Sequence, residues 1–334
     1  MIQLANEHIE VGLEPEYGAQ ILSITAAGST ANALAHYDWR SPTRARDGHR
    51  YGTSGTDWLS DYRGGWQELF PNSGAESTSH GITTPFHGEA SVSRWDVVEQ
   101  TATSCRLRVG ARTPLTLTRT MRLDATSPCL FLEEAVVNDG TEPADFVWGH
   151  HPVVPTFDGS RIDLPTCTVD VEPANTGGLD GRGGAWPLLP GAGGTTVDLS
   201  VVDAEPRHRL TYQHSLSEGW VAYRPPASAD TPGIALAWDL ETWPALWLWT
   251  LTRSGEFPWF GRASMMGVEP NRAWPFDGLD GARARGQHLR LEPGAVHTSW
   301  LTLRLLTDQL DVPVSSVERD GTLTRARADA SPGT

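Results

Sequence analysis

Short segments in which apolar and polar residues alternate recur through most of this chain and restrict its fold more than any other feature. They are Ser91–Val98, Ser104–Val109, Leu115–Leu123, Cys129–Val137, Ile234–Asp239, Leu246–Leu251 and His297–Leu305. Successive side chains of a strand point to opposite faces, so this period predicts strands with one buried face. Turn-forming residues such as Asn138-Asp139-Gly140 separate the segments, and no long amphipathic helical pattern interrupts them. We therefore predict an all-β fold, a large antiparallel β-sandwich.

Chain length and local composition suggest how this sandwich is organised. All-β domains often use this much chain as one unit, so we predict one catalytic sandwich domain over residues 1–307. Residues 308–334 are polar and small, which predicts a partly disordered C-terminal tail. The segment Glu172–Thr196 is rich in glycine and proline and predicts a long loop.

The charge and the N-terminal sequence restrict location and partners. The net charge of −15 is spread along the chain and would repel nucleic acid and anionic membranes. No apolar run is long enough to span a bilayer, and the first residues do not form a secretory signal. We therefore expect a cytoplasmic protein whose partner is a small, neutral molecule. The sequence does not indicate the oligomeric state.

The sequence contains no lysine. A lysine Schiff base, an internal pyridoxal phosphate aldimine and a phosphate-binding Walker loop all need that residue, so these mechanisms are excluded. The three cysteines, Cys105, Cys129 and Cys167, lack the spacing of metal ligands and are expected to be reduced thiols. No cofactor is therefore expected.

Three widely spaced strings place an ionisable side chain beside glycine or proline: Pro85–Glu89, Trp148–Pro152 and Gly267–Pro270. Their order is histidine, histidine, glutamate. Together with Gly65–Asn72 and the strand-like Pro244–Thr250, this order resembles the aldose 1-epimerase (galactose mutarotase) family. The resemblance runs from about Ile9 to about Leu306. It implies the large sandwich of that family, often called a supersandwich, and suggests that this chain is a divergent member.

The resemblance implies an isomerase that interconverts the α and β anomers of a free aldose by acid–base ring opening and closure. It assigns Glu269 as the base, His151 as the acid and His87 as a group that stabilises developing charge. His151 is favoured over His150 because the family places its histidine directly before the position matching Pro152. We expect a nearby carboxylate to make the histidine more basic.

Substrate contacts are predicted from the tryptophan content and from the family pattern. With 14 tryptophans in the chain, those near the motifs are candidates for covering a pyranose face. The family's arginine after the phenylalanine-proline segment is missing. Arg63 is a candidate replacement for it, and Asp239 for a further family carboxylate. The predicted substrate-binding residues are Arg63, Asn72, Trp66, Trp148, Asp239 and Trp247.

Other functions remain open from the sequence. A sandwich of this kind could be a non-catalytic carbohydrate-binding module, or a sugar-phosphate epimerase that uses Arg63, Arg94 and Arg272. A glycoside hydrolase would need two carboxylates, for which Glu89 and Glu269 are candidates. A metal-dependent enzyme could draw on His80, His87, His151 and Glu269.

Overall fold

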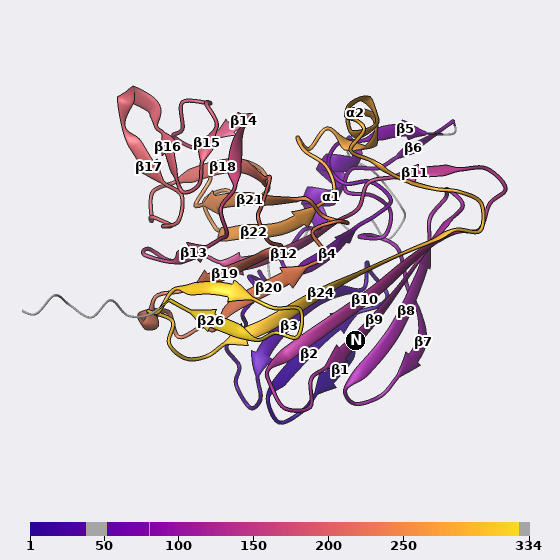
Figure 1. Cartoon of the computed structure of the whole chain (residues 1–334), viewed down its shortest axis with the longest axis horizontal. Helices are drawn as coiled ribbons and strands as arrows, with labels where there is room; N and C mark the ends of the chain where they lie inside the picture. The colour runs from indigo at the N-terminus through magenta and orange to yellow at the C-terminus, as the bar shows by residue number, and fades with distance from the viewer. Residues whose placement is uncertain (38–51, 80, 327–334) are drawn as a thin grey trace, which may run out of the picture.

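Two large antiparallel sheets pack face to face in the computed structural model, which describes residues 1–37, 52–79 and 81–326 (Figure 1). The ten-stranded sheet has the order β1 (Ile2–Ala5), β2 (Ile9–Glu14), β3 (Gln20–Ala26), β4 (Trp66–Leu69), β12 (Gly149–Pro155), β22 (Ser264–Asn271), β21 (Ala245–Thr252), β18 (Arg207–His214), β14 (Thr168–Thr176) and β15 (Gly184–Ala185). The sequence-based prediction of an all-β sandwich is confirmed.

The second sheet has eight strands. Their order is β13 (Arg161–Asp163), β19 (Trp220–Arg224), β20 (Gly233–Trp238), β24 (Val296–Leu306), β10 (Cys129–Asn138), β9 (Leu115–Leu123), β8 (Ser104–Gly110) and β7 (Asp96–Gln100). Strand β9 has the bounds that the alternation predicts, and its burial alternates residue by residue. The predicted strand Ser91–Val98 is wrong in its first half, because Val92 N–H and Ser93 N–H both donate to the Glu89 carbonyl in turns.

The main hydrophobic core lies between the two sheets. Leu13 and Ile21 from the ten-stranded sheet and Leu117, Leu132 and Leu303 from the eight-stranded sheet belong to one cluster and are at most 1% exposed. The opposite face of the ten-stranded sheet carries a separate cluster that includes Val153 and Met265. We call this second face the concave face, and it carries the candidate site.

Short elements frame this concave face. Helix α1 (Ser54–Asp61) follows β3, and helix α2 (Gly278–Arg285) follows β22. The small two-stranded sheets pair β5 (Ser77–Ser79) with β6 (Ile82–Thr84), β11 (Ala144–Phe146) with β23 (Leu289–Leu291), and β16 (Leu188–Pro190) with β17 (Thr196–Asp198). The chain also forms two 3-10 turns, η1 (Ala192–Gly194) and η2 (Ala227–Ala229). Figure 1 shows α2, β5, β6 and β11 together at one end of the molecule.

Two segments that were predicted to be irregular contain strands. The segment Glu172–Thr196 continues β14, forms β15 and β16, and packs Leu179 and Leu189 into a small core. In the predicted C-terminal tail, β25 (Val314–Val317) and β26 (Leu323–Arg325) form a hairpin (Figure 1). This hairpin buries apolar side chains against the outer face of the eight-stranded sheet, so residues 314–325 are part of the fold.

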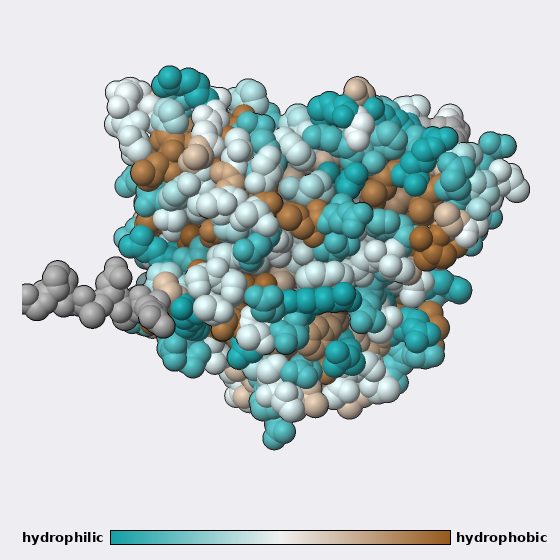
Figure 2. All heavy atoms as spheres, in the orientation of Figure 1, coloured by the Kyte–Doolittle hydropathy of each residue, from teal (hydrophilic) through white to brown (hydrophobic). Residues whose placement is uncertain are grey.

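The face shown in Figure 2 is mainly hydrophilic, and its hydrophobic patches are small and separate. Within the described ranges, no helix has the length and apolar character that crossing a lipid bilayer requires.

Candidate active site

His87 sits in a tight turn at one edge of the concave face. Its φ of 58° is rare for a residue with a side chain, and Gly88 follows with φ 75° where a Cβ would overlap the Phe70 carbonyl. The backbone N–H of Gly74 donates to His87 Nδ1 at 3.2 Å. The neutral ring therefore carries its proton on Nε2 and is a hydrogen-bond donor at that atom.

His151 and His150 are neighbours on β12 and point to opposite faces of the sheet. His151 pairs with Gln67 across the β4 ladder, and its ring lies on the concave face among aromatic side chains. His150 pairs with Glu68 and lies wholly buried between the two sheets. Only His151 can therefore act on a ligand bound at the concave face.

Glu269 lies on β22, the strand next to His151. Its Oε1 is 3.4 Å from His151 Nε2, and both side chains are at most 5% exposed. The carboxylate folds back over Gly267, where any Cβ would overlap Oε1. The motif glycine at position 267 therefore gives the carboxylate the space it occupies.

The structure brings His87, His151 and Glu269 together at one place, although they are far apart in the sequence. The two imidazole rings are 5.5 Å apart between centroids. Trp58 of α1 contacts both rings, at 4.8 Å from His87 and 5.6 Å from His151. Trp249 of β21 contacts His151 at 5.8 Å. The site is thus a small group of proton carriers enclosed by aromatic side chains.

Burial sets the protonation of this group. It lowers the pKa of His151 to about 4. It also holds the pKa of His87 well below its usual value, and His151 nearby adds to that effect. Burial raises the pKa of Glu269 well above its usual value. The expected increase in the basicity of His151 is therefore wrong for the unliganded site, because desolvation by burial dominates.

A second set of polar and aromatic side chains extends the concave face beyond Glu269. Trp247 of β21 pairs directly with Glu269 across the ladder, and its ring contacts Tyr212 of β18 at 5.6 Å. The Tyr212 hydroxyl donates to Glu172 Oε2 at 2.7 Å. Of the predicted substrate-binding residues, Trp247 is the one that lies on the same face of the sheet as Glu269. The sequence analysis missed Tyr212 and Glu172.

Solved structures resemble this chain over most of its length. A galactose mutarotase-like protein from Lactobacillus casei superimposes with a TM-score of 0.61 at 19% identity, covering 91% of this chain and 99% of its own. The Slr1438 protein from Synechocystis gives 0.62 at 18% identity, covering 92% and 96%. A Klebsiella pneumoniae protein provisionally named an aldose 1-epimerase gives 0.65 at 17% identity, covering 91% and 78%.

The chain has the galactose mutarotase-like fold. No protein-family profile and no curated protein matches the sequence, in keeping with the low identities to the solved structures. The resemblance inferred from the motifs is therefore confirmed at the level of the fold.

Within this mutarotase-like sandwich, two of the predicted substrate-binding tryptophans belong to the core. Trp66 is 1% exposed, and its Nε1–H donates to His150 Nδ1 at 3.2 Å. Trp148 is fully buried and its Nε1–H donates to Glu68 Oε1. Both rings lie on the His150 side of the ten-stranded sheet, so they cannot cover a sugar at Glu269.

The other three predicted substrate contacts have different surroundings from Trp247. Asn72 is fully buried, and its amide donates to the carbonyls of Ala75 and Pro85, so it braces the His87 turn instead of facing a ligand. Asp239 follows β20 in the other sheet and accepts from the Thr242 and Ser299 hydroxyls. Arg63 is exposed, next to Tyr62.

Four ionisable side chains form a buried cluster behind β12: Glu68, Arg119, Glu134 and His150. The Arg119 guanidinium contacts Glu68 Oε2, and its Nε donates to Glu134 Oε1 at 3.0 Å. His150 Nε2 lies 3.0 Å from Glu134 Oε2. Among the described residues, one set of three side chains has its potential ligand atoms close enough together to hold a metal ion: Glu68, Glu134 and His150. Arg119 already supplies a cation to both carboxyl groups there.

Two further candidate residues were Glu89 for a glycoside hydrolase and His80 for a metal-dependent enzyme. Glu89 accepts from Arg112 N–H at 2.7 Å and pairs with Arg112 Nε at 2.5 Å, so it is an ion-paired residue of the His87 turn. His80, a candidate metal ligand, lies outside the described residues.

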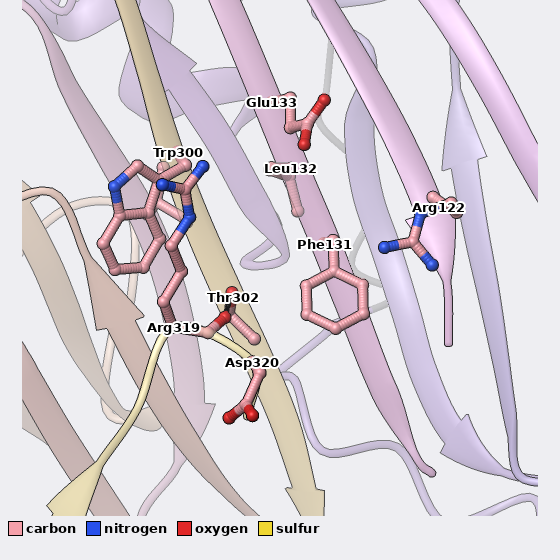
Figure 3. A pocket seen from close by; sticks show the side chains of 9 residues that line it. Arg122, Phe131, Leu132, Glu133, Trp300, Thr302, Arg319 and Asp320 are labelled. Carbon is pink, nitrogen blue, oxygen red and sulfur yellow. Dashed lines mark hydrogen bonds between the residues drawn. The ribbon is translucent and has the colours of Figure 1, made fainter. Parts of the chain in front are cut away.

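A shallow hollow of about 310 Å³ lies on the outer face of the eight-stranded sheet (Figure 3). Its two aromatic rings are already covered, because the Arg319 guanidinium lies 4.8 Å from the Trp300 ring and that of Arg122 lies 4.6 Å from Phe131. Glu133 and Asp320 balance these two charges in the same hollow. It therefore offers no open platform for a sugar ring.

Proposed function

We propose that this protein is an aldose 1-epimerase that opens and closes the hemiacetal ring of a free aldose. The observation that carries the proposal is the pair His151 Nε2 and Glu269 Oε1, 3.4 Å apart on the concave face. The hydroxyl and ring oxygens of a hemiacetal are bonded to the same carbon. An acid and a base this close together can therefore address both oxygens at once.

Ring opening needs two proton transfers. Glu269 takes the proton from the C1 hydroxyl, and His151 in its imidazolium form gives the Nε2 proton to the ring oxygen. The electron pair of the C1–O5 bond passes to the ring oxygen, and a carbonyl forms at C1. After rotation about C1–C2, the reverse transfers close the ring on the other face. At the end of the cycle, Glu269 and His151 again hold the protons with which they began, and the sugar has gained or lost no atoms.

This cycle requires that Glu269 and His151 together hold one proton. With none, the pair lacks an acid; with two, it lacks a base. Burial favours the uncharged arrangement in the free protein, with the proton on Glu269. A bound sugar supplies hydroxyl partners for the charged arrangement, in which the proton is on His151.

His87 and the aromatic residues complete the proposed site. The neutral His87 ring can donate from Nε2 to an oxygen on which negative charge develops. Trp58 and Trp249 exclude water around His151, which strengthens these interactions. Trp247 and Tyr212 are buried beside Glu269, and their rings pack against each other on its side of the sheet.

The nature of the sugar is tested by a substrate panel. Free aldoses and their 6-phosphates are screened by saturation-transfer NMR, with and without a metal chelator. We expect acceleration of anomer exchange for at least one free aldose, unchanged by the chelator. Acceleration of 6-phosphates alone would favour the sugar-phosphate epimerase. Binding without acceleration of any sugar would overturn the proposal in favour of a non-catalytic binding protein.

A further inference from the structure

The indole of Trp249 lies between two histidines of the concave face. Trp249 of β21 pairs with Leu210 of β18, so His208, two residues before Leu210, is its diagonal neighbour on the same face. On its other side Trp249 pairs with Gly267 of β22, which adds no side chain, and its ring contacts that of His151 on β12 at 5.8 Å. The indole therefore connects His208 with His151 across the sheet.

A chain of two hydrogen bonds holds this indole at its nitrogen. Trp249 Nε1–H donates to His208 Nε2 at 3.0 Å, and His208 Nδ1 lies 2.6 Å from Glu256 Oε2, in the segment between β21 and β22. An indole N–H can only donate, so Nε2 of His208 accepts and the proton of the neutral ring lies on Nδ1. Nδ1–H then donates to the Glu256 carboxylate. The chain is thus directed from Trp249 through His208 to Glu256.

We propose that His208 is a positioning residue for the epimerase reaction and acts on His151 through the indole of Trp249. The hydrogen bonds do not depend on the epimerase function, whereas their effect on rate rests on it. Held at Nε1, the indole keeps its ring against His151 and keeps water away from this proton donor. Without the acceptor at His208, the indole N–H gains most by turning towards water, which draws the ring away from His151.

The test uses two substitutions at position 208 and a matched control on the same strand. His208→Phe keeps an aromatic ring but has no acceptor, whereas the amide oxygen of His208→Gln can accept near the former position of Nε2. The control is His214→Phe. Nε2 of His214 lies 3.3 Å from Asp170 Oδ2, and its ring stacks on Trp274 at 4.8 Å, so His214 also joins a carboxylate and an indole on β18, at a different tryptophan.

The first measurement follows the indole N–H of Trp249 by nitrogen-15 NMR at pH 8, with the signal assigned by its loss in Trp249→Phe. We expect a downfield proton signal that exchanges slowly with water in the wild type, in His208→Gln and in His214→Phe. In His208→Phe the signal should move upfield and exchange faster. An unchanged signal in folded His208→Phe would overturn the proposal.

The tautomer of His208 gives a test that needs no folded variant at position 208. Nitrogen-15 labelling of histidine, with the His208 signal identified by its loss in His208→Gln, should show Nδ1–H and an unprotonated Nε2 in the wild type at pH 8, where a histidine is ordinarily neutral. The signal may equally be identified from its contact with the Trp249 indole proton. A protonated Nε2 in the wild type would overturn the proposal.

The second measurement is anomer exchange. For His208→Phe we expect kcat to fall about tenfold with little change in KM, because the lost contact acts on the proton donor and not on sugar binding. His208→Gln should recover most of the wild-type kcat, and His214→Phe should keep it. An equal kcat for His208→Phe and His214→Phe would contradict the positioning role.

A double-mutant cycle shows whether the effect passes through Trp249. Trp249→Phe already removes the indole N–H, so adding His208→Phe to it should lower kcat no further. A second loss of about tenfold in the double variant would show that His208 acts by another route and would overturn the proposal. A wild type that exchanges no aldose would refute the epimerase function, while the NMR measurements would still decide whether His208 holds Trp249.

Discussion

Replacing Arg119 with methionine tests how the fold holds β12 in place. Arg119 is 1% exposed and supplies the cation between two fully buried carboxylates, Glu68 and Glu134. It also donates to the Ala19 carbonyl at 3.0 Å and lies 4.7 Å from the Trp95 ring. Removing one partner of a buried ion pair costs about 3–5 kcal/mol, because a charge is left buried without compensation. We expect Arg119→Met to lower the free energy of unfolding by this amount.

The assay is urea unfolding followed by circular dichroism, with Arg122→Met as the control. Arg122 lies on the outer face over Phe131, so its loss should cost less than about 1 kcal/mol. Burial already raises the pKa of Glu68, and loss of the Arg119 cation, which lowers that pKa, should raise it further. The cost should then be full at pH 7.5 and smaller at pH 5, where the folded state takes up protons.

A triple variant separates the lost charge balance from lost packing. Arg119→Met combined with Glu68→Gln and Glu134→Gln leaves no uncompensated charge in the cluster, so much of the stability should return. A single Arg119→Met variant as stable as Arg122→Met at pH 7.5 would refute the reasoning.

Three further predictions concern the site. The pH dependence of kcat/KM, measured by polarimetry, should be bell-shaped. Its acidic limb should lie near pH 4 and come from His151, and its alkaline limb should come from Glu269 and lie above the usual glutamate pKa. An alkaline limb that survives in Glu269→Gln would count against this assignment. Gly267→Ala should cut kcat about 10–100-fold with unchanged urea unfolding, because the new Cβ displaces the Glu269 carboxylate; a full rate would show that this placement is unimportant. Asparagine tolerates the positive φ of residue 87 but lacks the Nε2–H donor. We therefore expect His87→Asn to lower kcat about 10²–10³-fold in the NMR exchange assay. An increase in KM with unchanged kcat would instead indicate that His87 binds the substrate.

The sequence predicted the sandwich because alternation is a strong signal over long strands, as in Leu115–Leu123. It also singled out His87, His151 and Glu269, which the fold brings close together. Strand alternation excludes Trp148 from the site, because it lies two residues before His150 and faces the same way. The same alternation separates His150 from His151.

Other features could not be read from the chain. Helix α1 is only eight residues long, so Trp58 and Tyr62 gave no clear helical pattern. Asp239 belongs to the other sheet, which depends on strand order and not on local sequence. The pKa of His151 depends on how completely the folded protein excludes water around it, and a neighbouring carboxylate in the sequence pattern does not report that.

The most direct test of the epimerase proposal is the anomer exchange rate of Glu269→Gln, measured by saturation-transfer NMR on the aldose that the wild type accelerates most. Glutamine keeps the shape of the side chain but cannot take the C1 hydroxyl proton, so the rate should fall about 10²–10⁴-fold. The control is Glu133→Gln, the same change on the outer face of the other sheet, which should keep the wild-type rate. A Glu269→Gln variant that exchanges anomers as fast as Glu133→Gln would contradict the proposed mechanism.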